Sequence, residues 1–197
     1  GLNLGASIKS PQWFERVEIN STDAAGFGRE LTTQFNFPLI ASFGASYSGI
    51  ENVLIAADVR YVDFDSAQLF GEPAQFSGTG ALRGLGWESV WVFCLGGQLQ
   101  LTDKFALRMG YSFNQNPIPD RLSMFNVLAP SPYQHVFNLG GSYQLTKALV
   151  ASLTWVHGFD HTISGPFIAP PGVPVPLSRV AISQEIDTVV AGLSVLF

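Results

Sequence analysis

The sequence predicts an all-β fold, an antiparallel transmembrane β-barrel of which about eight strands are present. Hydrophobic and polar residues alternate with a period of two, because successive side chains of a strand leave its backbone on opposite sides. The 197 residues are 47% hydrophobic and only 13% charged, yet no apolar run reaches the roughly 18–20 residues of a membrane-spanning helix. Short connections alternate with long ones, as the periplasmic turns and extracellular loops of outer-membrane barrels do.

The first three strands are predicted at residues 2–20, 30–48 and 51–64. Pro11 has no N–H group, so a bend or bulge is expected within the first strand. In the second strand the outward side chains keep one parity through Pro38. This strand is longer than the 9–11 residues that cross a bilayer, and it should therefore project beyond the membrane.

Five more strands are predicted at residues 88–101, 105–113, 133–145, 149–155 and 188–197. The turns within the hairpins are short, at residues 49–52, 102–104 and 146–147. The other connections are long, at residues 62–87, 114–132 and 158–182. This asymmetry predicts that the long connections are extracellular.

The character of the polar face favours a barrel lumen over a soluble β-sandwich. From the third strand through the seventh, the alternating segments carry three charges, Asp58, Arg60 and Arg108, all opposite the apolar face. A soluble sandwich would spread Lys and Glu over its exposed face. Together with Gln98 and Asn138, these residues are our candidates for substrate contact. Either the charges solvate one another across strands, or an arginine binds a substrate carboxylate.

The loop at residues 166–176 is unusually apolar. It contains Phe167, Ile168, Val173 and Val175 together with five prolines and one glycine. An exposed apolar stretch often marks a binding surface, so these four residues are candidates for capturing a hydrophobic ligand. The alternative is a rigid proline-rich loop that packs over the mouth of the barrel.

Several segments carry a family resemblance, and their order and spacing matter more than any one of them. They are residues 9–14 (Lys-Ser-Pro-Gln-Trp-Phe), 56–61 (Ala-Ala-Asp-Val-Arg-Tyr), 86–93 (Gly-Trp-Glu-Ser-Val-Trp-Val-Phe), 101–104, 107–113 and 116–120 (Asn-Pro-Ile-Pro-Asp). From about Lys9 onward the chain resembles the C-terminal part of the FadL/OmpP1/TodX family of outer-membrane transporters for hydrophobic compounds.

The resemblance implies a barrel of about fourteen strands with an N-terminal hatch domain in its lumen. It also implies passive uptake of long-chain fatty acids or aromatic hydrocarbons across the bacterial outer membrane. We expect residues 1–197 to form a single transmembrane β-barrel domain without the hatch and the early strands. The alternative is a small structural barrel of eight strands without transport activity, filled by its own side chains.

The end of the chain resembles the assembly signal of outer-membrane barrels, with Gly192, Val195 and the terminal aromatic Phe197. The expected partners are therefore the barrel-insertion machinery, the lipid bilayer and a hydrophobic small molecule.

Composition and spacing argue against other classes of function. The net charge of −5 and the scattered basic residues argue against nucleic acid binding. His157 and His161 are four residues apart, a spacing that brings two ligands together on a helix but not on an extended strand, and no third ligand follows in a recognisable spacing. No metal site is therefore predicted, and no cofactor is expected. A hydrolase would have to combine His135 or His157 with Ser152 or Asp160, and no spacing brings such a set to one face. The protein is therefore not expected to be an enzyme.

Overall fold

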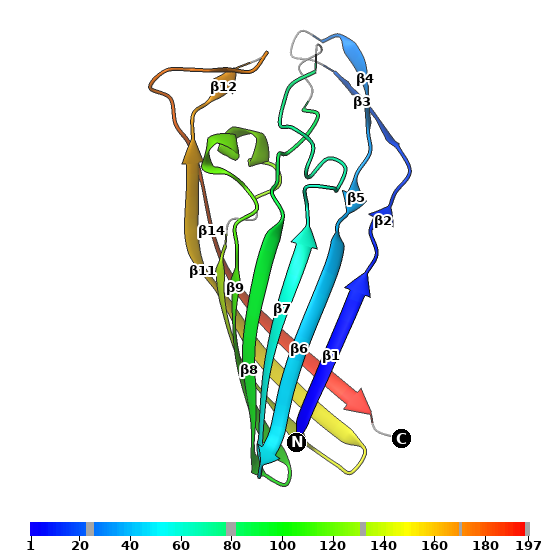
Figure 1. The fold of residues 1–197 in the computed structure, drawn as a ribbon, viewed down its shortest axis with the longest axis vertical. Coiled ribbons are helices and arrows are strands. Elements are labelled where there is room, and N and C mark those ends of the chain that lie inside the picture. The colour runs from blue at the N-terminus through cyan, green and yellow to red at the C-terminus, as the bar shows by residue number, and fades with distance from the viewer. Residues whose placement is uncertain (23–25, 78–81, 131–132, 170, 196–197) are drawn as a thin grey trace.

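One large antiparallel sheet dominates the computed structural model, which describes residues 1–22, 26–77, 82–130, 133–169 and 171–195 (Figure 1). Its strand order is β1-β6-β7-β8-β9-β10-β11-β14. The bounds are β1 (Leu2–Lys9), β6 (Leu39–Ile50), β7 (Val53–Asp63), β8 (Val90–Thr102), β9 (Phe105–Asn114), β10 (His135–Gln144), β11 (Leu149–Gly165) and β14 (Val180–Val195). The prediction of eight antiparallel barrel strands is confirmed. We call this sheet the wall.

The expected interruption of the first strand at Pro11 is confirmed, but both of the first two predicted strands divide further, and the expectation that the second continues through Pro38 was wrong. Residues 2–20 divide into β1, β2 (Gln12–Trp13) and β3 (Val17–Thr22), and residues 30–48 divide into β4 (Gly28–Thr33), β5 (Asn36–Phe37) and β6. The breaks fall at Pro11 and Pro38, which cannot donate a backbone hydrogen bond to the ladder, and at residues 14–16 and 34–35. The outer segments leave the wall and pair as β2–β5 and β3–β4.

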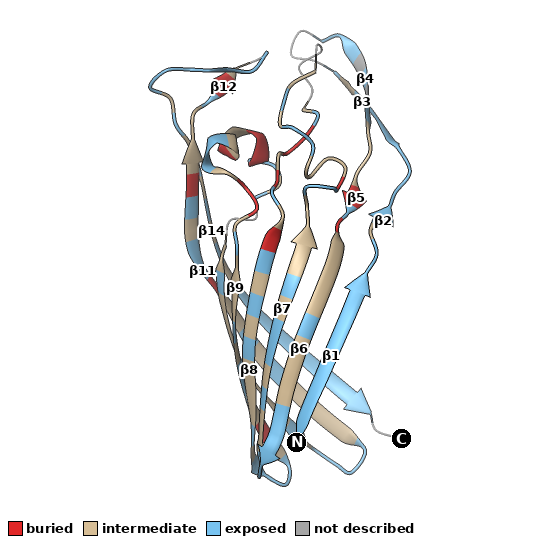
Figure 2. Ribbon diagram, viewed as in Figure 1, coloured by how far each residue is buried: buried red, intermediate tan, exposed pale blue. Residues whose placement is uncertain are grey.

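The register confirms the two faces that alternation predicted. Register partners along one row are Phe43, Val59, Phe93 and Phe113, which belong to the apolar outward face. The adjacent row is Gly44, Asp58, Cys94 and Ser112, which belongs to the inward face. Within the wall most residues are exposed or half-buried, and buried residues gather at the loop end (Figure 2).

Aromatic side chains border the apolar outward face near both ends of the strands. Phe105 and Tyr143 are neighbours near the short turns, and Phe113 lies eight residues further along β9. At about 3.4 Å per residue this separation is roughly 27 Å along the strand, which a tilt of 35–45° reduces to somewhat less than the apolar band of about 25 Å. At the outer end, the rings of Tyr61 and Trp91 lie 5.1 Å apart.

The last hairpin is longer than predicted, because β11 extends to Gly165 and β14 begins at Val180. The expected loop at residues 158–182 is therefore reduced to residues 166–179. Gly158 pairs with Ile186, but His161 pairs with Gln184, so β11 carries one extra residue in a β-bulge. A bulge reverses which face the following residues occupy. The alternation of hydrophobic and polar residues therefore loses its phase at the bulge, and the sequence pattern did not predict the outer part of β11.

The two long connections after β7 and β9, which the sequence predicted as loops, pack together above the wall. We call residues 64–77, 82–89 and 115–130 the extracellular lobe. Its buried core contains Leu85, Trp87 and Ile118, joined by Ile163 from beyond the bulge of β11. The lobe includes the 3-10 helix η1 (Asp120–Asn126). In the described part of the chain no helix has the length and apolarity that a membrane crossing requires.

Asn126 joins the two connections of the lobe and is completely buried. Its side-chain oxygen accepts a hydrogen bond of 2.6 Å from the indole N–H of Trp87. Its amide nitrogen donates to the carbonyl oxygens of Leu85 at 3.0 Å and of Leu122 at 3.1 Å. One side chain therefore satisfies three buried polar groups, as buried groups require.

Candidate functional site

The candidate site is the inward face of the wall, where the register places all five lumen residues that the sequence singled out. Asp58 and Arg60 lie two residues apart on β7, with Gly44 opposite Asp58 on the neighbouring β6. A Cβ atom at Gly44 would collide with the carboxylate of Asp58. Asp58 therefore lies across β6, over a position that has no side chain.

Arg108 is held by two neutral partners rather than by an acid. Its Nε donates to the side-chain oxygen of Gln98 at 2.7 Å, and its Nη1 donates to the hydroxyl of Ser142 at 2.9 Å. These residues come from β8, β9 and β10, where Gln98 lies directly opposite Arg108 and Ser142 lies on the diagonal, two residues from Gly140, the partner of Arg108. The sequence identified Gln98 and Arg108 but not the role of Ser142. Ser142 is 34 residues from Arg108 along the chain, and only the pairing of β9 with β10 brings the two together.

The structure does not pair the inward charges with one another. Within the described residues, the side chains of Asp58 and Arg60 make no hydrogen bond or ion pair, and that of Arg108 makes no ion pair. Asn138 lies inward between Gly110 and Val156. The positive charge of Arg108 is thus hydrogen-bonded but not neutralised, which leaves it available to a negatively charged group.

The structure has two hollows of note, one on the inward face beside Asp58 and one among the outer segments. One, of about 410 Å³, is formed by β1, β6 and β7 and is lined by small side chains together with Asp58. The other, of about 580 Å³, lies among the outer segments and contains Arg16, Arg83 and Glu72. The sequence did not point to the second hollow, because its residues come from separate irregular segments that follow no period.

The four residues of the apolar loop divide between two environments. Ile168 is buried, whereas Phe167, Val173 and Val175 remain 38–61% exposed. The loop forms a small hairpin of β12 (Ile168–Ala169) and β13 (Val173–Pro174). Its base is closed by a hydrogen bond of 2.8 Å from Val175 N to Phe167 O. It is thus an ordered hairpin that presents three apolar side chains to its surroundings.

The residues of the expected assembly signal lie at the end of β14. Gly192 pairs with Ser152 and Val195 pairs with Leu149 on β11. Val195 is on the outward face and is exposed. Phe197 lies outside the described residues.

The hydrolase alternative fails on geometry. His157 pairs with outward Phe137, whereas Ser152 pairs with inward Ser142. The two side chains therefore lie on opposite faces of β11. Asp160 accepts a hydrogen bond from Ser183, but within the described residues no histidine is bonded to either side chain.

An antiparallel wall with an apolar outward face, a polar inward face and aromatic borders defines a β-barrel protein of the outer-membrane class. Residues 9–164 match the family described as outer membrane protein transport protein (OMPP1/FadL/TodX). The chain therefore belongs to this family of bacterial outer-membrane proteins.

Solved structures of similar fold agree with this assignment. A Pseudomonas aeruginosa FadL homologue superposes with a TM-score of 0.67, at 13% identity, over 98% of this chain and 47% of its own. The ΔS2 mutant of the TodX monoaromatic hydrocarbon channel gives 0.62, at 17% identity, over 98% and 46%. Its ΔS2S3 mutant gives 0.60, at 17% identity, over 97% and 45%.

At such low identities these similarities show the fold alone. The chain spans a little under half the length of these structures, in agreement with the expectation of a partial barrel. No curated protein sequence matches the chain.

Proposed function

We propose that the barrel to which this wall contributes is a channel for the passive uptake of hydrophobic molecules, long-chain fatty acids or aromatic hydrocarbons. The observation that carries the proposal is the open sheet, in which β1 and β14 are the two ends and do not pair. Exposed sheet edges are not tolerated in a bilayer. The wall therefore belongs to a barrel of more than eight strands, which is wide enough to hold a passage.

The same topology argues against the alternative of a small structural barrel. A closed barrel of eight strands requires a ladder between its first and last strands, and its interior is filled by side chains. The inward face has instead many small residues, such as Gly44, Gly96 and Gly110, and a hollow beside Asp58. We therefore retain the channel as the proposed function.

Uptake by whole cells tests this proposal. Cells that lack the intact protein should take up labelled oleate or toluene more slowly than cells that express it, and re-expression should restore the rate. Equal uptake of both compounds in the two strains would overturn the proposal.

The substrate class depends on the inward arginines. If Arg108 binds a carboxylate, R108Q should reduce oleate uptake and leave toluene uptake unchanged, since toluene has no charge to recognise. R121Q is a matched control, because Arg121 is exposed on the extracellular lobe and lies 4.0 Å from Glu88. If R108Q changes the uptake of neither compound, Arg108 does not bind substrate and is only one of the polar groups that line the lumen.

The apolar hairpin is proposed to capture ligand at the outer end. Replacing Phe167, Val173 and Val175 with Ser should slow uptake at low substrate concentration and have little effect at saturation, because capture raises the local concentration. An unchanged rate at both concentrations would assign the hairpin to packing alone.

We also propose that the barrel-insertion machinery recognises Phe197, so its deletion should reduce the amount of folded protein in the membrane.

A further inference from the structure

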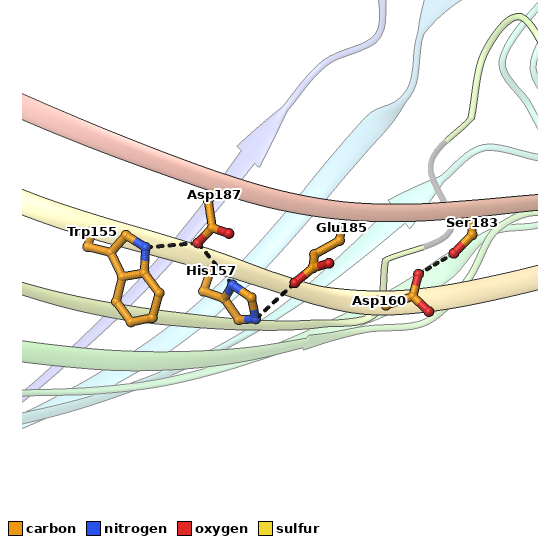
Figure 3. A network of polar contacts seen from close by, with 6 residues as sticks. All are labelled: Trp155, His157, Asp160, Ser183, Glu185 and Asp187. Carbon is orange, nitrogen blue, oxygen red and sulfur yellow. Dashed lines mark hydrogen bonds and ion pairs between the residues drawn. The ribbon is translucent and has the colours of Figure 1, made fainter.

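We propose that His157 and Glu185 bind a divalent transition-metal ion of the zinc class on the outward face of the wall, with Asp187 as a positioning residue. His157 lies on β11, and Glu185 and Asp187 lie on β14 (Figure 3). One ligand atom from each of the three residues lies within 4.8 Å of the others. The cluster combines an imidazole with carboxylates, a ligand set that zinc accepts.

The cluster lies where the wall leaves the apolar band of the membrane. His157 is two residues beyond Trp155 on the same face of β11, about 7 Å along the strand. Trp155 has the character of an interfacial aromatic, because its ring is exposed on the outward face and its N–H has a polar partner. Charged side chains are costly on the lipid face near the midplane but cost little near the interfaces. The histidine and the two carboxylates therefore fit a position near the interface, where ions can reach them from outside.

The histidine ring is already oriented for metal binding. His157 Nδ1 lies 3.0 Å from Asp187 Oδ1, and the same oxygen accepts a hydrogen bond of 2.9 Å from the indole N–H of Trp155. Trp155 stacks on the imidazole at 5.5 Å and Phe159 meets it edge-on at 4.6 Å. Donation from Nδ1 leaves the lone pair on Nε2, as in the carboxylate–histidine–zinc arrangement.

Glu185 supplies the second ligand. Its carboxylate oxygen lies 3.9 Å from His157 Nε2, on the side of the ring opposite Asp187. Two ligand atoms about 2.0–2.2 Å from a tetrahedral zinc are roughly 3.4 Å apart. The Glu185 side chain is 59% exposed, so a small rotation closes this difference. The remaining coordination positions would face solvent.

Sequence reasoning missed this site because it considered His161 as the partner of His157. The bulge places His161 opposite Gln184, on the inward face. The two histidines therefore point to opposite sides of the wall. The actual partners lie 28 and 30 residues away along the chain.

Metal titration of the intact protein in detergent, after treatment with a chelator, tests the proposal. Calorimetry with Zn²⁺ should show saturable binding of one equivalent, and Cu²⁺ should give an electron paramagnetic resonance spectrum with coupling to one imidazole nitrogen. Both signals should be lost in H157A, and E185Q should weaken binding. D187N should weaken Zn²⁺ binding by about 10–100-fold while it keeps the nitrogen coupling.

H135A and H161A are matched controls, because His135 and His161 are the other two histidines of the sequence. Both should bind Zn²⁺ like the wild type. The heat-dependent gel mobility of each variant shows whether its barrel is folded. E185Q should fold like the wild type, because Glu185 is exposed and Gln has nearly the same volume as Glu. Absence of saturable binding in the wild type, or binding that survives in folded H157A or is equally lost in folded H161A, would overturn the proposal.

Discussion

Replacing Asn126 with Ala should loosen the extracellular lobe and leave the wall intact. The variant leaves the buried indole N–H of Trp87 without its partner and removes two donors from the carbonyls of Leu85 and Leu122. An unsatisfied buried polar group costs about 1–3 kcal/mol, and a hydrogen bond to a carbonyl contributes roughly 1 kcal/mol. We expect the free energy of lobe opening to fall by about 2–4 kcal/mol.

Limited trypsin digestion of the folded protein in detergent measures this change. Arg83 and Arg121 lie within the lobe, whereas Lys104 and Lys147 lie in the short turns at the other end. When cleavage follows local opening, its rate tracks the population of the open form, so cleavage at the two arginines should accelerate by roughly 30–1,000-fold. Cleavage at the two lysines should not change.

N20A provides the control, because Asn20 is exposed on β3 and its replacement should leave the digestion pattern as in the wild type. Cleavage of N126A at Arg83 and Arg121 at the wild-type rate would refute the reasoning. In that case the two long connections would not depend on the Asn126 hydrogen bonds for their packing.

Three further tests, which use five substitutions, address other parts of the fold. M109R places a charge on the lipid face midway along β9 and should destabilise the barrel by about 2–4 kcal/mol, as measured by denaturant titration. G96R on the inward face should be tolerated, and a similar loss of stability in both variants would contradict the assignment of faces. G71A should destabilise the lobe by about 1–3 kcal/mol, since its Cβ would meet backbone carbonyls, whereas G44A should be nearly neutral because only a side-chain carboxylate must move. The trypsin assay and melting curves compare the two variants, and equal effects would count against the packing described. I163A should cost the lobe about 2–5 kcal/mol, because this side chain is completely buried, and unchanged protease resistance would be inconsistent with its place in the core.

The sequence by itself determined the class of fold and the two faces of the wall. Alternation is a local property of the strand, so Asp58 and Arg108 could be assigned to the inward face before any pairing was known. The same pattern predicted the turn-linked hairpins from β6 to β11. It could not show that the outer parts of the first two strands leave the wall, because Pro38 breaks the ladder without breaking the parity of the side chains.

Only the tertiary structure decided what depends on register between distant strands. The bulge after Gly158 sends His161 and Ile163 inward, and Ile163 then completes a core with Trp87 and Ile118. The contact of His157 with Asp187 likewise requires β14 to pair with β11 in one register. Neither has a sequence signature, because a single extra residue changes which side chains meet while composition and local propensity stay the same.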